Sequence, residues 1–380
     1  MRHMKNPFRY GMRVGGCEFF DRTKIMRDIR NTLDGGNNVL LYGPRRYGKS
    51  SLVGEILAAV RKSGDVCVEL NMMDIASLDD FIARYASAIY RELAPTTGAL
   101  KHVAGLFKRI TPTISIGDEG KPELKFSIAS PKAGLDALRD ALELPERLCP
   151  DNRHVVIALD EFQEVAGLGL GVQFERTMRS IVEKQRHVSY IYLGSKTHLL
   201  ERMFAAKSRP FYNSAQKFLL LRPPANESAA FLTARFASVG LKLSPALAEH
   251  MVTKVDNVPY YLQALGSWTF NATSGRGSRT VTQADVDEGF DSLYNAERIL
   301  LENTFISHPQ SQRLLMRALA SEPTASFPEA YRLRHGLAST STVNTALRRL
   351  IAESTVDHYE DGYHLADPIL ACHLSEHRAP

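Results

Sequence analysis

This chain of 380 residues has few cysteines and lacks long apolar runs. Each of these features excludes a class of protein. No CxxC pair occurs, so the sequence predicts neither a disulfide framework nor a zinc site from its few cysteines, Cys17, Cys67, Cys149 and Cys372. No run of about 18 apolar residues is present, and no apolar segment follows the basic residues near the N-terminus. Because the cysteines suit a reducing compartment and no targeting or membrane-spanning segment is visible, we expect a cytoplasmic globular protein without membrane contact.

The overall composition is that of an ordinary globular protein. Hydrophobic residues make up 44% of the chain, and its length suggests about two or three domains. The formal net charge of +5 is compatible with an anionic partner and equally with a solvated surface. Charge alone therefore does not identify a partner.

One short segment carries the strongest functional signal. Residues 43–50 match the phosphate-binding pattern GxxxxGK[ST], and they lie between an apolar strand at 38–42 and a helix that begins near Ser51. In such a loop the backbone N–H groups and the positive end of the helix dipole cradle a di- or triphosphate. We expect Lys49 to reach the β and γ phosphates and the Ser50 hydroxyl to bind Mg²⁺. The predicted nucleotide-binding residues here are Gly43, Pro44, Arg45, Arg46, Tyr47, Gly48, Lys49, Ser50 and Ser51.

Further apolar segments predict a parallel sheet of the α/β class. Candidate strands lie at 66–70, 155–159, 188–193 and 217–221, and helical spacing appears at 77–93 and 135–148. Between these helices, a stretch at about 112–130 alternates apolar and polar residues on both sides of a Gly/Pro turn. We interpret that stretch as a surface hairpin inserted into the domain.

An acidic pair follows the strand at 155–159. In doubly wound sheets the ends of neighbouring strands form the ligand site, so Asp160 is predicted to hold Mg²⁺ through water. Glu161 is predicted to orient or deprotonate the attacking water. The pair favours hydrolysis over phosphoryl transfer to a metabolite. The alternative is a strand that ends in a solvated acidic turn.

Two further polar residues are candidates for the γ-phosphate. Ser195 follows the strand at 188–193 and is predicted to sense that phosphate, a plain helix N-cap being the alternative. Arg209 could bring a cation to the nucleotide or could simply lie in a surface loop. The sequence does not decide either question.

Beyond residue 224 the pattern changes from strands to helices. Helical spacing is present at 225–239, 244–255, 259–272 and 282–293, and the residues from Thr282 to Asp285 resemble a capping box. We interpret this region as a helical lid that would convert the difference between ATP and ADP into a change of domain angle. A rigid helical subdomain is the alternative.

The last part of the chain predicts a winged helix. Helices are expected at 310–319, 327–333 and 341–351, followed by two short strands around a turn at 360–362. The third helix carries residue types that suit DNA, namely Ser339, Thr340, Ser341, Thr342, Asn344, Arg348 and Arg349. The wing, however, carries Asp357, Glu360 and Asp361. Contact with the protein's own domains or with another protein is therefore favoured, and DNA contact stays open.

Taken together, these motifs resemble the archaeal-type ATPase family, a branch of the STAND class of P-loop NTPases related to AAA+ proteins. Besides the phosphate loop, the resemblance rests on residues 6–11, 20–22, 160–162, 193–195, 210–212, 259–262 and 363–368. It implies an additional-strand sheet, in which a fourth strand separates the phosphate-loop strand from the Asp-Glu strand. It also implies an adenine pocket bordered by residues 20–22, with Arg22 and Pro259 among the nucleotide-binding residues.

The chain departs from this family pattern at three places. Asn257-Val258-Pro259 stands where the class usually carries Gly-x-Pro, and Asn tolerates the backbone angles that such a turn needs. Ser214 occupies a position where many relatives have an arginine, so no arginine finger is expected there. Asp21 replaces a frequent glycine before Arg22.

The sequence thus predicts a P-loop ATPase domain at 1–224, a helical lid at 225–296 and a winged helix at 297–380. The predicted function is an Mg²⁺-dependent, ATP-hydrolysing switch that couples the nucleotide to lid and winged-helix rearrangement, in signalling, in assembly or on DNA. The alternative is a DNA-binding regulator in which ATP is mainly structural. Candidate partners are DNA, another protein or a second copy of the chain.

Overall fold

The computed structural model describes residues 5–16, 19, 22–93, 110–116, 122–128, 134–149, 153–359 and 362–376. Some residues singled out above lie outside these ranges, namely Cys17, Phe20, Asp21, Glu360 and Asp361. Contacts divide the chain into two units. The sheet unit comprises residues 22–43 and 49–220, and the helical unit comprises 1–21, 44–48 and 221–380. The break at 220 is close to the predicted boundary at 224, whereas residues 1–21 and 44–48 group with the C-terminal part.

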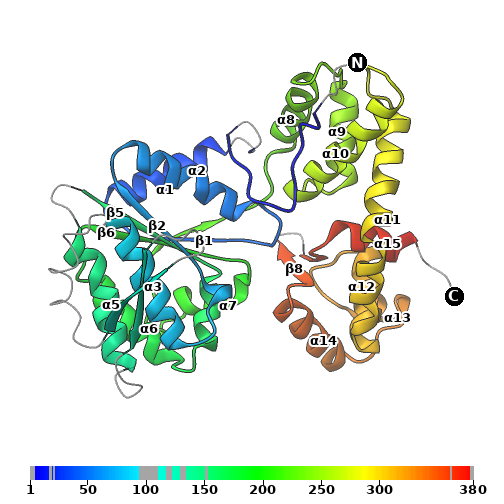
Figure 1. The fold of residues 1–380 in the computed structure, drawn as a ribbon. Coiled ribbons are helices and arrows are strands. Elements are labelled where there is room, and N and C mark those ends of the chain that lie inside the picture. Colours follow the sequence, from blue (N-terminus) through cyan, green and yellow to red (C-terminus); the bar gives the residue numbers. More distant parts are fainter. Residues whose placement is uncertain are drawn as a thin grey trace. The chain divides into compact units, whose positions relative to one another are not determined.

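A five-stranded parallel sheet forms the core of the sheet unit (Figure 1). The strand order is β2-β5-β6-β1-β7, with β1 at Val39–Tyr42, β2 at Val66–Asn71, β5 at Val155–Asp160, β6 at Val188–Gly194 and β7 at Gln216–Leu219. β6 therefore lies between β1, which leads into the phosphate loop, and β5, which ends at the acidic pair. The additional-strand sheet is confirmed.

Helices cover both faces of this sheet. In Figure 1, α1 and α2 lie on one face, and α3, α5, α6 and α7 lie on the other. Their bounds are Thr23–Asp34, Lys49–Lys62, Leu78–Leu93, Gly134–Leu148, Val172–Val182 and Thr197–Ala205. Every residue of β1 and β6 is buried, as expected for central parallel strands between two helical layers, while the edge strand β7 is largely exposed.

The predicted hairpin region forms a separate two-stranded sheet. β3 at Ile110–Ile116 and β4 at Pro122–Ile128 pair antiparallel with each other. They lie in the stretch for which alternating residues predict an insertion, and β3 begins slightly earlier than that stretch. The parallel sheet contains neither strand.

Four helices open the C-terminal part of the helical unit. They are α8 at Ala225–Ala237, α9 at Pro245–Lys254, α10 at Pro259–Gly275 and α11 at Gln283–Ser307. α8 packs against α9, and α10 packs along α11. α11 extends well beyond its predicted end and runs without a break through residues 296 and 297. The division between a lid and a winged helix at that point stays a prediction.

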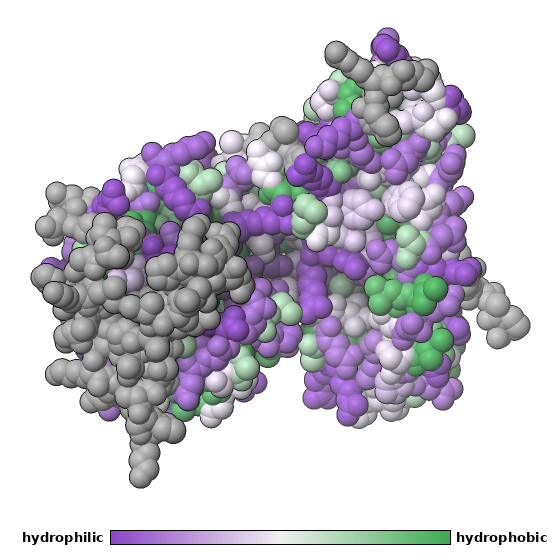
Figure 2. Space-filling model, in the orientation of Figure 1, coloured by the Kyte–Doolittle hydropathy of each residue, from purple (hydrophilic) through white to green (hydrophobic). Residues whose placement is uncertain are grey.

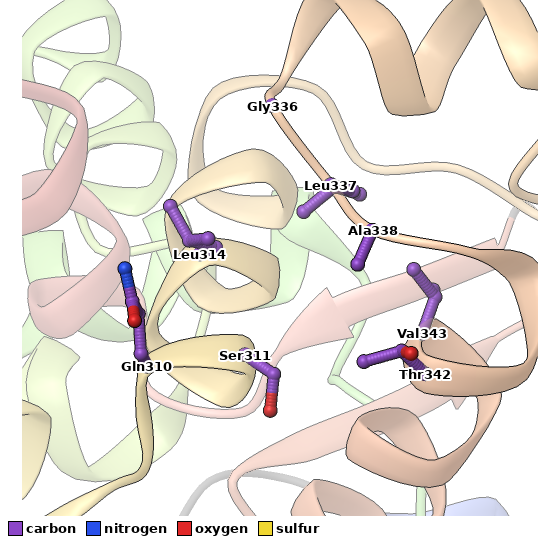
Figure 3. A pocket seen from close by; sticks show the side chains of 8 residues that line it. All are labelled: Gln310, Ser311, Leu314, Gly336, Leu337, Ala338, Thr342 and Val343. Atoms are coloured by element: carbon purple, nitrogen blue, oxygen red, sulfur yellow. The ribbon is translucent and has the colours of Figure 1, made fainter.

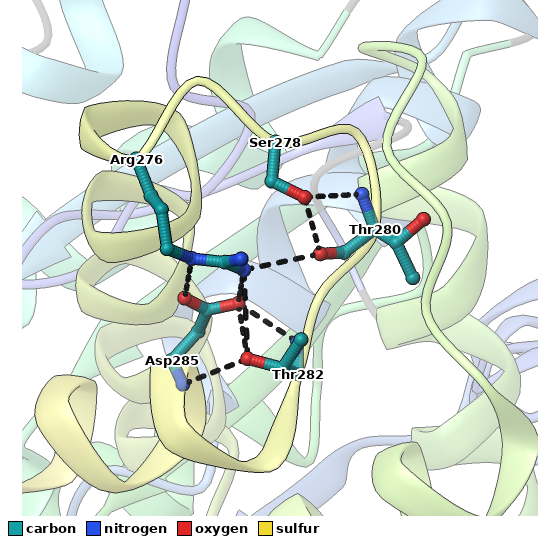
Figure 4. A network of polar contacts seen from close by, with 5 residues as sticks. All are labelled: Arg276, Ser278, Thr280, Thr282 and Asp285. Carbon is teal, nitrogen blue, oxygen red and sulfur yellow. Dashed lines mark hydrogen bonds and ion pairs between the residues drawn. The ribbon is translucent and has the colours of Figure 1, made fainter.

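A polar network fixes the start of α11 (Figure 4). The Thr282 hydroxyl accepts from the N–H of Asp285 at 3.4 Å, and the Asp285 carboxylate accepts from the N–H of Thr282 at 2.8 Å. Arg276, just after α10, donates to both carboxylate oxygens of Asp285 at 3.0 and 2.5 Å. The predicted capping box is therefore confirmed, and an ion pair joins it to the end of the preceding helix.

The end of the chain folds as a winged helix. It contains α12 at Gln310–Ser321, α13 at Glu329–Arg334, α14 at Thr340–Ala352, β8 at Val356–Tyr359, β9 at Gly362–Leu365 and α15 at Pro368–Glu376. β8 and β9 pair antiparallel, and α12 packs against α14 and α15. α14 buries residues at helical spacing, Val343, Ala346, Leu347 and Leu350, so its opposite face is left to solvent.

The surface is mixed in character. On the face shown in Figure 2, apolar residues occur in small patches among hydrophilic ones. Across the described part of the chain, the helices lack the combination of length and apolar character that spanning a bilayer needs.

Candidate functional site

Several polar residues predicted from the sequence meet at the carboxyl edge of the parallel sheet. Asp160 is the last residue of β5, Ser195 follows β6, and Lys49 is the first residue of α2. Tyr42 at the end of β1 is paired in register with Gly194 at the end of β6. Because parallel strands end at the same edge, the order β5-β6-β1 places these residues together.

Lys49 and Ser50 begin α2 and turn toward this edge. The Lys49 ammonium donates to the carbonyl oxygen of Gly43 at 2.8 Å, and the residue is only 7% exposed. The Ser50 hydroxyl donates to Asp160 Oδ2 at 2.7 Å. The Ser50 hydroxyl and the Asp160 carboxylate, which were predicted separately as metal ligands, are therefore in contact.

This pair of oxygen groups fits Mg²⁺. In phosphate-transfer sites Mg²⁺ is held by one or two protein oxygens, and phosphates and waters complete its shell. Within the described residues, no cluster of three or more His, Cys, Asp or Glu side chains could hold a metal by itself. Ser50 and Asp160 therefore suit a metal that arrives together with a nucleotide.

Gly43 allows the phosphate loop to leave the sheet close to the edge strand. A Cβ at Gly43 would lie 2.6 Å from the carbonyl oxygen of Leu220, which is too close for any side chain. The N–H of Leu220 donates to the Tyr42 carbonyl at 2.7 Å, so backbone pairing brings the two segments together. The first glycine of the motif is thus required by packing in this chain.

Glu161 is held in an unusual backbone conformation. Its φ of 50° lies in the left-handed region, where non-glycine residues are uncommon and occur often at functional sites. Its carboxylate accepts from the Ser195 hydroxyl at 2.9 and 3.1 Å, from the Ser195 N–H at 3.2 Å, and from the Gln163 side chain. The carboxylate therefore has a defined position.

Ser195 does not cap the following helix. The N-cap of α7 is Lys196, and no side chain caps that helix end. Ser195 is 4% exposed and donates to Glu161 instead. The N-cap alternative is therefore wrong, and contact with a γ-phosphate stays a prediction.

The surroundings of Glu161 favour its ionised form. Burial raises the pKa of Glu161, but hydrogen bonds from Gln163 and Ser195 and the charge of Lys49 outweigh burial, so its pKa lies below the ordinary value. At neutral pH the side chain is a carboxylate. This is the form that can orient a water molecule or accept its proton.

Gln163, which helps to position Glu161, belongs to none of the motifs recognised in the sequence, whereas Gly194 and Phe162 appeared there only as parts of the family motifs. A Cβ on Gly194 would lie 2.0 Å from Gln163 Oε1, so only glycine leaves room for the buried Gln163 side chain. Phe162 anchors the same turn, with its ring 4.7 Å from that of Tyr192 and 5.5 Å from that of Phe211. A glycine directly after a buried strand was the available signal.

Arg209 is engaged by an acidic residue of α6. It forms an ion pair with Glu175 of α6, whose side chain is 2% exposed. Burial raises the pKa of Glu175, and the charge of Arg209 opposes that rise. Ser214, at the position where relatives carry an arginine, donates to the Phe211 carbonyl at 2.8 Å. In this structure Arg209 therefore pairs with a buried carboxylate, and its contact with a nucleotide stays a prediction.

The tip of the phosphate loop, residues 44–48, belongs to the helical unit. Arg45 is exposed, whereas Tyr47 is buried and its hydroxyl accepts from Arg222 at 3.1 Å. Arg46 has a φ of 68°, and its carbonyl accepts from the N–H of Tyr260 at 3.3 Å. The loop tip is therefore packed against the start of α10.

The turn before α10 contains two successive non-glycine residues in the left-handed conformation. Asp256 and Asn257 have φ angles of 53° and 54°, so Asn257 adopts the left-handed conformation for which glycine is usual. Its side chain donates to the Pro223 carbonyl at 2.6 Å. Pro259 is buried and begins α10 as a first-turn proline. The expected tolerance of Asn257 is confirmed.

Arg22, the other residue assigned to the nucleotide by resemblance, is the N-cap residue of α1 and makes no side-chain cap. Because Phe20 and Asp21 lie outside the described residues, the adenine pocket stays a prediction.

α14 presents a polar face to solvent. Its exposed polar residues are Thr340, Ser341, Thr342, Asn344, Thr345, Arg348 and Arg349, and no residue of this helix is acidic. A cavity of about 250 Å³ lies beside its first turn. Figure 3 shows the residues that line it, which are Gln310, Ser311, Leu314, Gly336, Leu337, Ala338, Thr342 and Val343.

Two family models match parts of the chain. A model described as "Probable winged helix domain" matches residues 300–376. A model described as "Protein of unknown function (DUF815)" matches residues 19–93, which include the phosphate loop. None of the curated proteins matches the chain.

Solved structures share the fold over nearly the whole length. The Walker-type ATPase of Pyrococcus abyssi has a TM-score of 0.64 and 19% identity, covering 94% of this chain and 96% of that one. The Aeropyrum pernix ORC2 protein in its ADPNP-ADP complexes has a TM-score of 0.57 and 17% identity, covering 93% and 90%. Its ADP form has a TM-score of 0.50 and 14% identity, covering 93% of both chains. The chain therefore has the fold of a Walker-type P-loop ATPase with a C-terminal winged helix.

Proposed function

We propose that the protein binds ATP with Mg²⁺ and hydrolyses it, and that the nucleotide cycle works as a conformational switch. The observation that carries this proposal is the arrangement at the sheet edge. Ser50 bonds Asp160 at 2.7 Å, and the next residue, Glu161, is an ionised carboxylate held by Ser195 at 2.9 Å. Metal ligand and water-orienting base are thus adjacent in the chain and separately fixed.

Each residue has a distinct role in this proposal. The loop N–H groups and Lys49 bind the phosphates, and Ser50 and Asp160 hold the metal. Mg²⁺, when bound, neutralises charge that develops on the phosphate oxygens. Glu161 orients the attacking water and takes its proton, so that ATP and water give ADP and inorganic phosphate. Ser195 keeps the Glu161 carboxylate in place and is a candidate contact for the γ-phosphate.

The switch itself would involve the helical unit. We place the lid at residues 225–296 and the output domain at 297–380, with Pro259 and Arg22 as further nucleotide contacts. Support comes from the loop tip, whose residues pack against the start of α10. Membership of the STAND class and a cytoplasmic location belong to the same proposal.

Nucleotide binding is tested first by a pair of lysine variants. Lys49→Ala removes the buried ammonium at the loop, whereas Lys62→Ala removes an exposed one at the other end of the same helix. We expect Lys49→Ala to abolish binding of a fluorescent ATP analogue and Lys62→Ala to bind like the wild type. Equal binding by the two variants would show that this loop is not the nucleotide site.

DNA binding by α14 is a second candidate function, in which ATP could be mainly structural. The supporting observation is the solvent face of α14, which offers hydroxyl, amide and guanidinium groups and no carboxylate. Such side chains contact phosphates and base edges when a helix enters the major groove. The same face could instead contact a protein or a second copy of the chain.

Electrophoretic mobility over a salt series, with and without ATP, separates these outcomes. If α14 binds DNA, affinity must fall with salt, and replacing both Arg348 and Arg349 by alanine must flatten that dependence. Arg317→Ala on α12 is the matched control, because Arg317 is exposed and lies outside α14. Salt-independent retention, or none, would exclude the DNA function.

A further inference from the structure

A single carboxylate in the helical unit joins the winged helix to the phosphate loop. Asp367 lies between β9 and α15, and its Oδ1 accepts from the N–H groups of Ile369 and Leu370 at 3.0 and 3.2 Å, which caps α15. Its Oδ2 accepts from the Tyr261 hydroxyl at 2.6 Å and from Arg46 Nη1 at 2.5 Å. One carboxylate oxygen therefore bonds the winged helix, and the other bonds the phosphate loop and α10.

Arg46 is fixed by more than this ion pair. Its guanidinium lies 4.9 Å from the ring centroids of both Tyr260 and Tyr261, and it also bonds the Tyr261 hydroxyl. Its side chain is 33% exposed and that of Asp367 is 24% exposed, so the pair is partly shielded from solvent. Glu297 on α11 adds a further negative charge nearby. Side chain, ring and backbone contacts all converge on this one loop residue.

The backbone of Arg46 explains why such support matters. A phosphate loop binds anions when successive N–H groups converge, which requires residues with left-handed φ angles within the loop. Arg46 has a φ of 68°, which glycine adopts freely but which is unfavourable for arginine. Contacts with residues outside the loop can stabilise this conformation. Arg46 makes such contacts with Asp367, Tyr260 and Tyr261.

We propose that Asp367 is a positioning residue for nucleotide binding, which holds the loop in its anion-binding conformation through Arg46 and thereby couples the winged helix to nucleotide occupancy. This inference rests on the proposed binding of ATP. The coupling is reciprocal by thermodynamic linkage: if the cap of α15 affects ATP affinity, ATP must stabilise the cap of α15.

The first test uses substitutions that leave α15 capped. Asp367→Asn keeps an oxygen for the helix cap and removes the charge, and Tyr261→Phe keeps the ring and removes the hydroxyl. We expect each to weaken ATP binding, Asp367→Asn by about 5-fold to 100-fold. The matched control is Asp287→Asn, which removes the charge from a 3.1 Å ion pair between α9 and α11 in the same unit. It should bind ATP like the wild type.

A rescue variant tests the backbone argument itself. Glycine adopts the left-handed conformation without help, so Arg46→Gly should make the loop independent of Asp367. Adding Asp367→Asn to Arg46→Gly should then leave ATP affinity unchanged. A merely structural role of Asp367 would instead make the double variant weaker than Arg46→Gly alone.

Hydrogen exchange of residues 362–376 in the full chain, with and without ATP, measures the reciprocal effect. We expect ATP to slow exchange in the wild type and to have less effect in Asp367→Asn. Wild-type affinity in both Asp367→Asn and Tyr261→Phe, or exchange unaffected by ATP, would overturn the coupling. Failure of the wild type to bind ATP would overturn the proposed function instead. The Arg46–Asp367 link would still be tested by a double-mutant cycle on thermal unfolding without nucleotide, in which additive effects would overturn it.

Discussion

Ser195 donates its hydroxyl to Glu161 Oε2 at 2.9 Å, across the ends of two neighbouring strands. The Glu161 carboxylate directly follows β5, and the residue that holds it directly follows β6, the additional strand. The strand order of the sheet thus has a direct chemical consequence, because the chain leaving β6 supplies Ser195, which bonds the proposed base. β6 itself supplies Gly194, whose missing side chain leaves room for Gln163.

Removing the Ser195 hydroxyl should shift the pH dependence of hydrolysis. The pKa of Glu161 is lowered in the folded protein, and hydrogen bonds from Ser195 are among the causes. In Ser195→Ala the pKa should rise toward the ordinary glutamate value, so the acid limb of the pH–rate profile should move to higher pH. Ser180→Ala, which removes a helix hydroxyl on α6, is the control. An unmoved acid limb would show that Ser195 does not control Glu161.

The same shift predicts a change in acid stability. A lowered carboxyl pKa contributes stability that is present above the unfolded value, about 4.3, and is lost as pH falls through the folded value. Ser195→Ala should therefore be less stable than the wild type near neutral pH, with the difference shrinking in acid. Thermal unfolding at several pH values measures it, and a difference that grew as pH fell would contradict this explanation.

Gly194→Ala should disturb Glu161 through Gln163. The new Cβ would collide with the Gln163 side chain, so we expect hydrolysis to fall by about 10-fold to 100-fold from misplacement of the carboxylate. Overpacking should also cost about 1–3 kcal/mol of stability. Gly167→Ala is the control, because a Cβ there meets no atom within 4 Å. Unchanged hydrolysis in Gly194→Ala would show that Gln163 does not position the Glu161 carboxylate.

Hydrolysis should require Mg²⁺ and depend on Ser50. Chelating the metal should stop turnover, and Ser50→Ala should raise the Mg²⁺ concentration for half-maximal rate by at least about 10-fold. Ser87→Ala, which loses only an intrahelical hydrogen bond on α3, should show the wild-type requirement. A Mg²⁺ titration of steady-state rates checks this. The same requirement in both variants would exclude Ser50 as a ligand.

The turn before α10 should tolerate glycine better than alanine. Asn257 has a left-handed φ of 54°, a conformation that costs alanine about 1–2 kcal/mol. Both variants lose the hydrogen bond to Pro223, and alanine alone adds the backbone cost, so Asn257→Ala should be the least stable of the three proteins. Denaturant midpoints of the wild type, Asn257→Gly and Asn257→Ala give the order. An Asn257→Ala variant as stable as Asn257→Gly would contradict the predicted order.

Local patterns in the sequence predicted much of the fold. Strands such as β5 and β6 are continuous apolar runs, and α10 and α11 begin at a first-turn proline and a capping box. The position of β6 between β1 and β5 did not follow from any run of residues and came from the family resemblance. α1, α6, α7 and α15 were not predicted, and the end of α11 was placed too early.

The candidate site was predicted as residues but not as contacts. Lys49, Ser50, Asp160 and Glu161 stand out because their motifs are short and local. The bond between Ser195 and Glu161 and the bond between Arg46 and Asp367 join residues 34 and 321 positions apart, and no local pattern encodes such pairs. Arg209 illustrates the same point, because its partner Glu175 could not be identified from the sequence around it.

Single-turnover hydrolysis by Glu161→Gln tests the central claim most directly. The variant keeps the size of the side chain and one acceptor oxygen but cannot take a proton from water, so it should bind ATP and hydrolyse it about 100-fold or more slowly than the wild type. Glu164→Gln is the matched control, since Glu164 pairs with Lys196 at 2.8 Å and has no part in the proposed site. Retained ATP binding with lost hydrolysis in Glu161→Gln alone is the predicted result. Hydrolysis at the wild-type rate by Glu161→Gln would contradict the account.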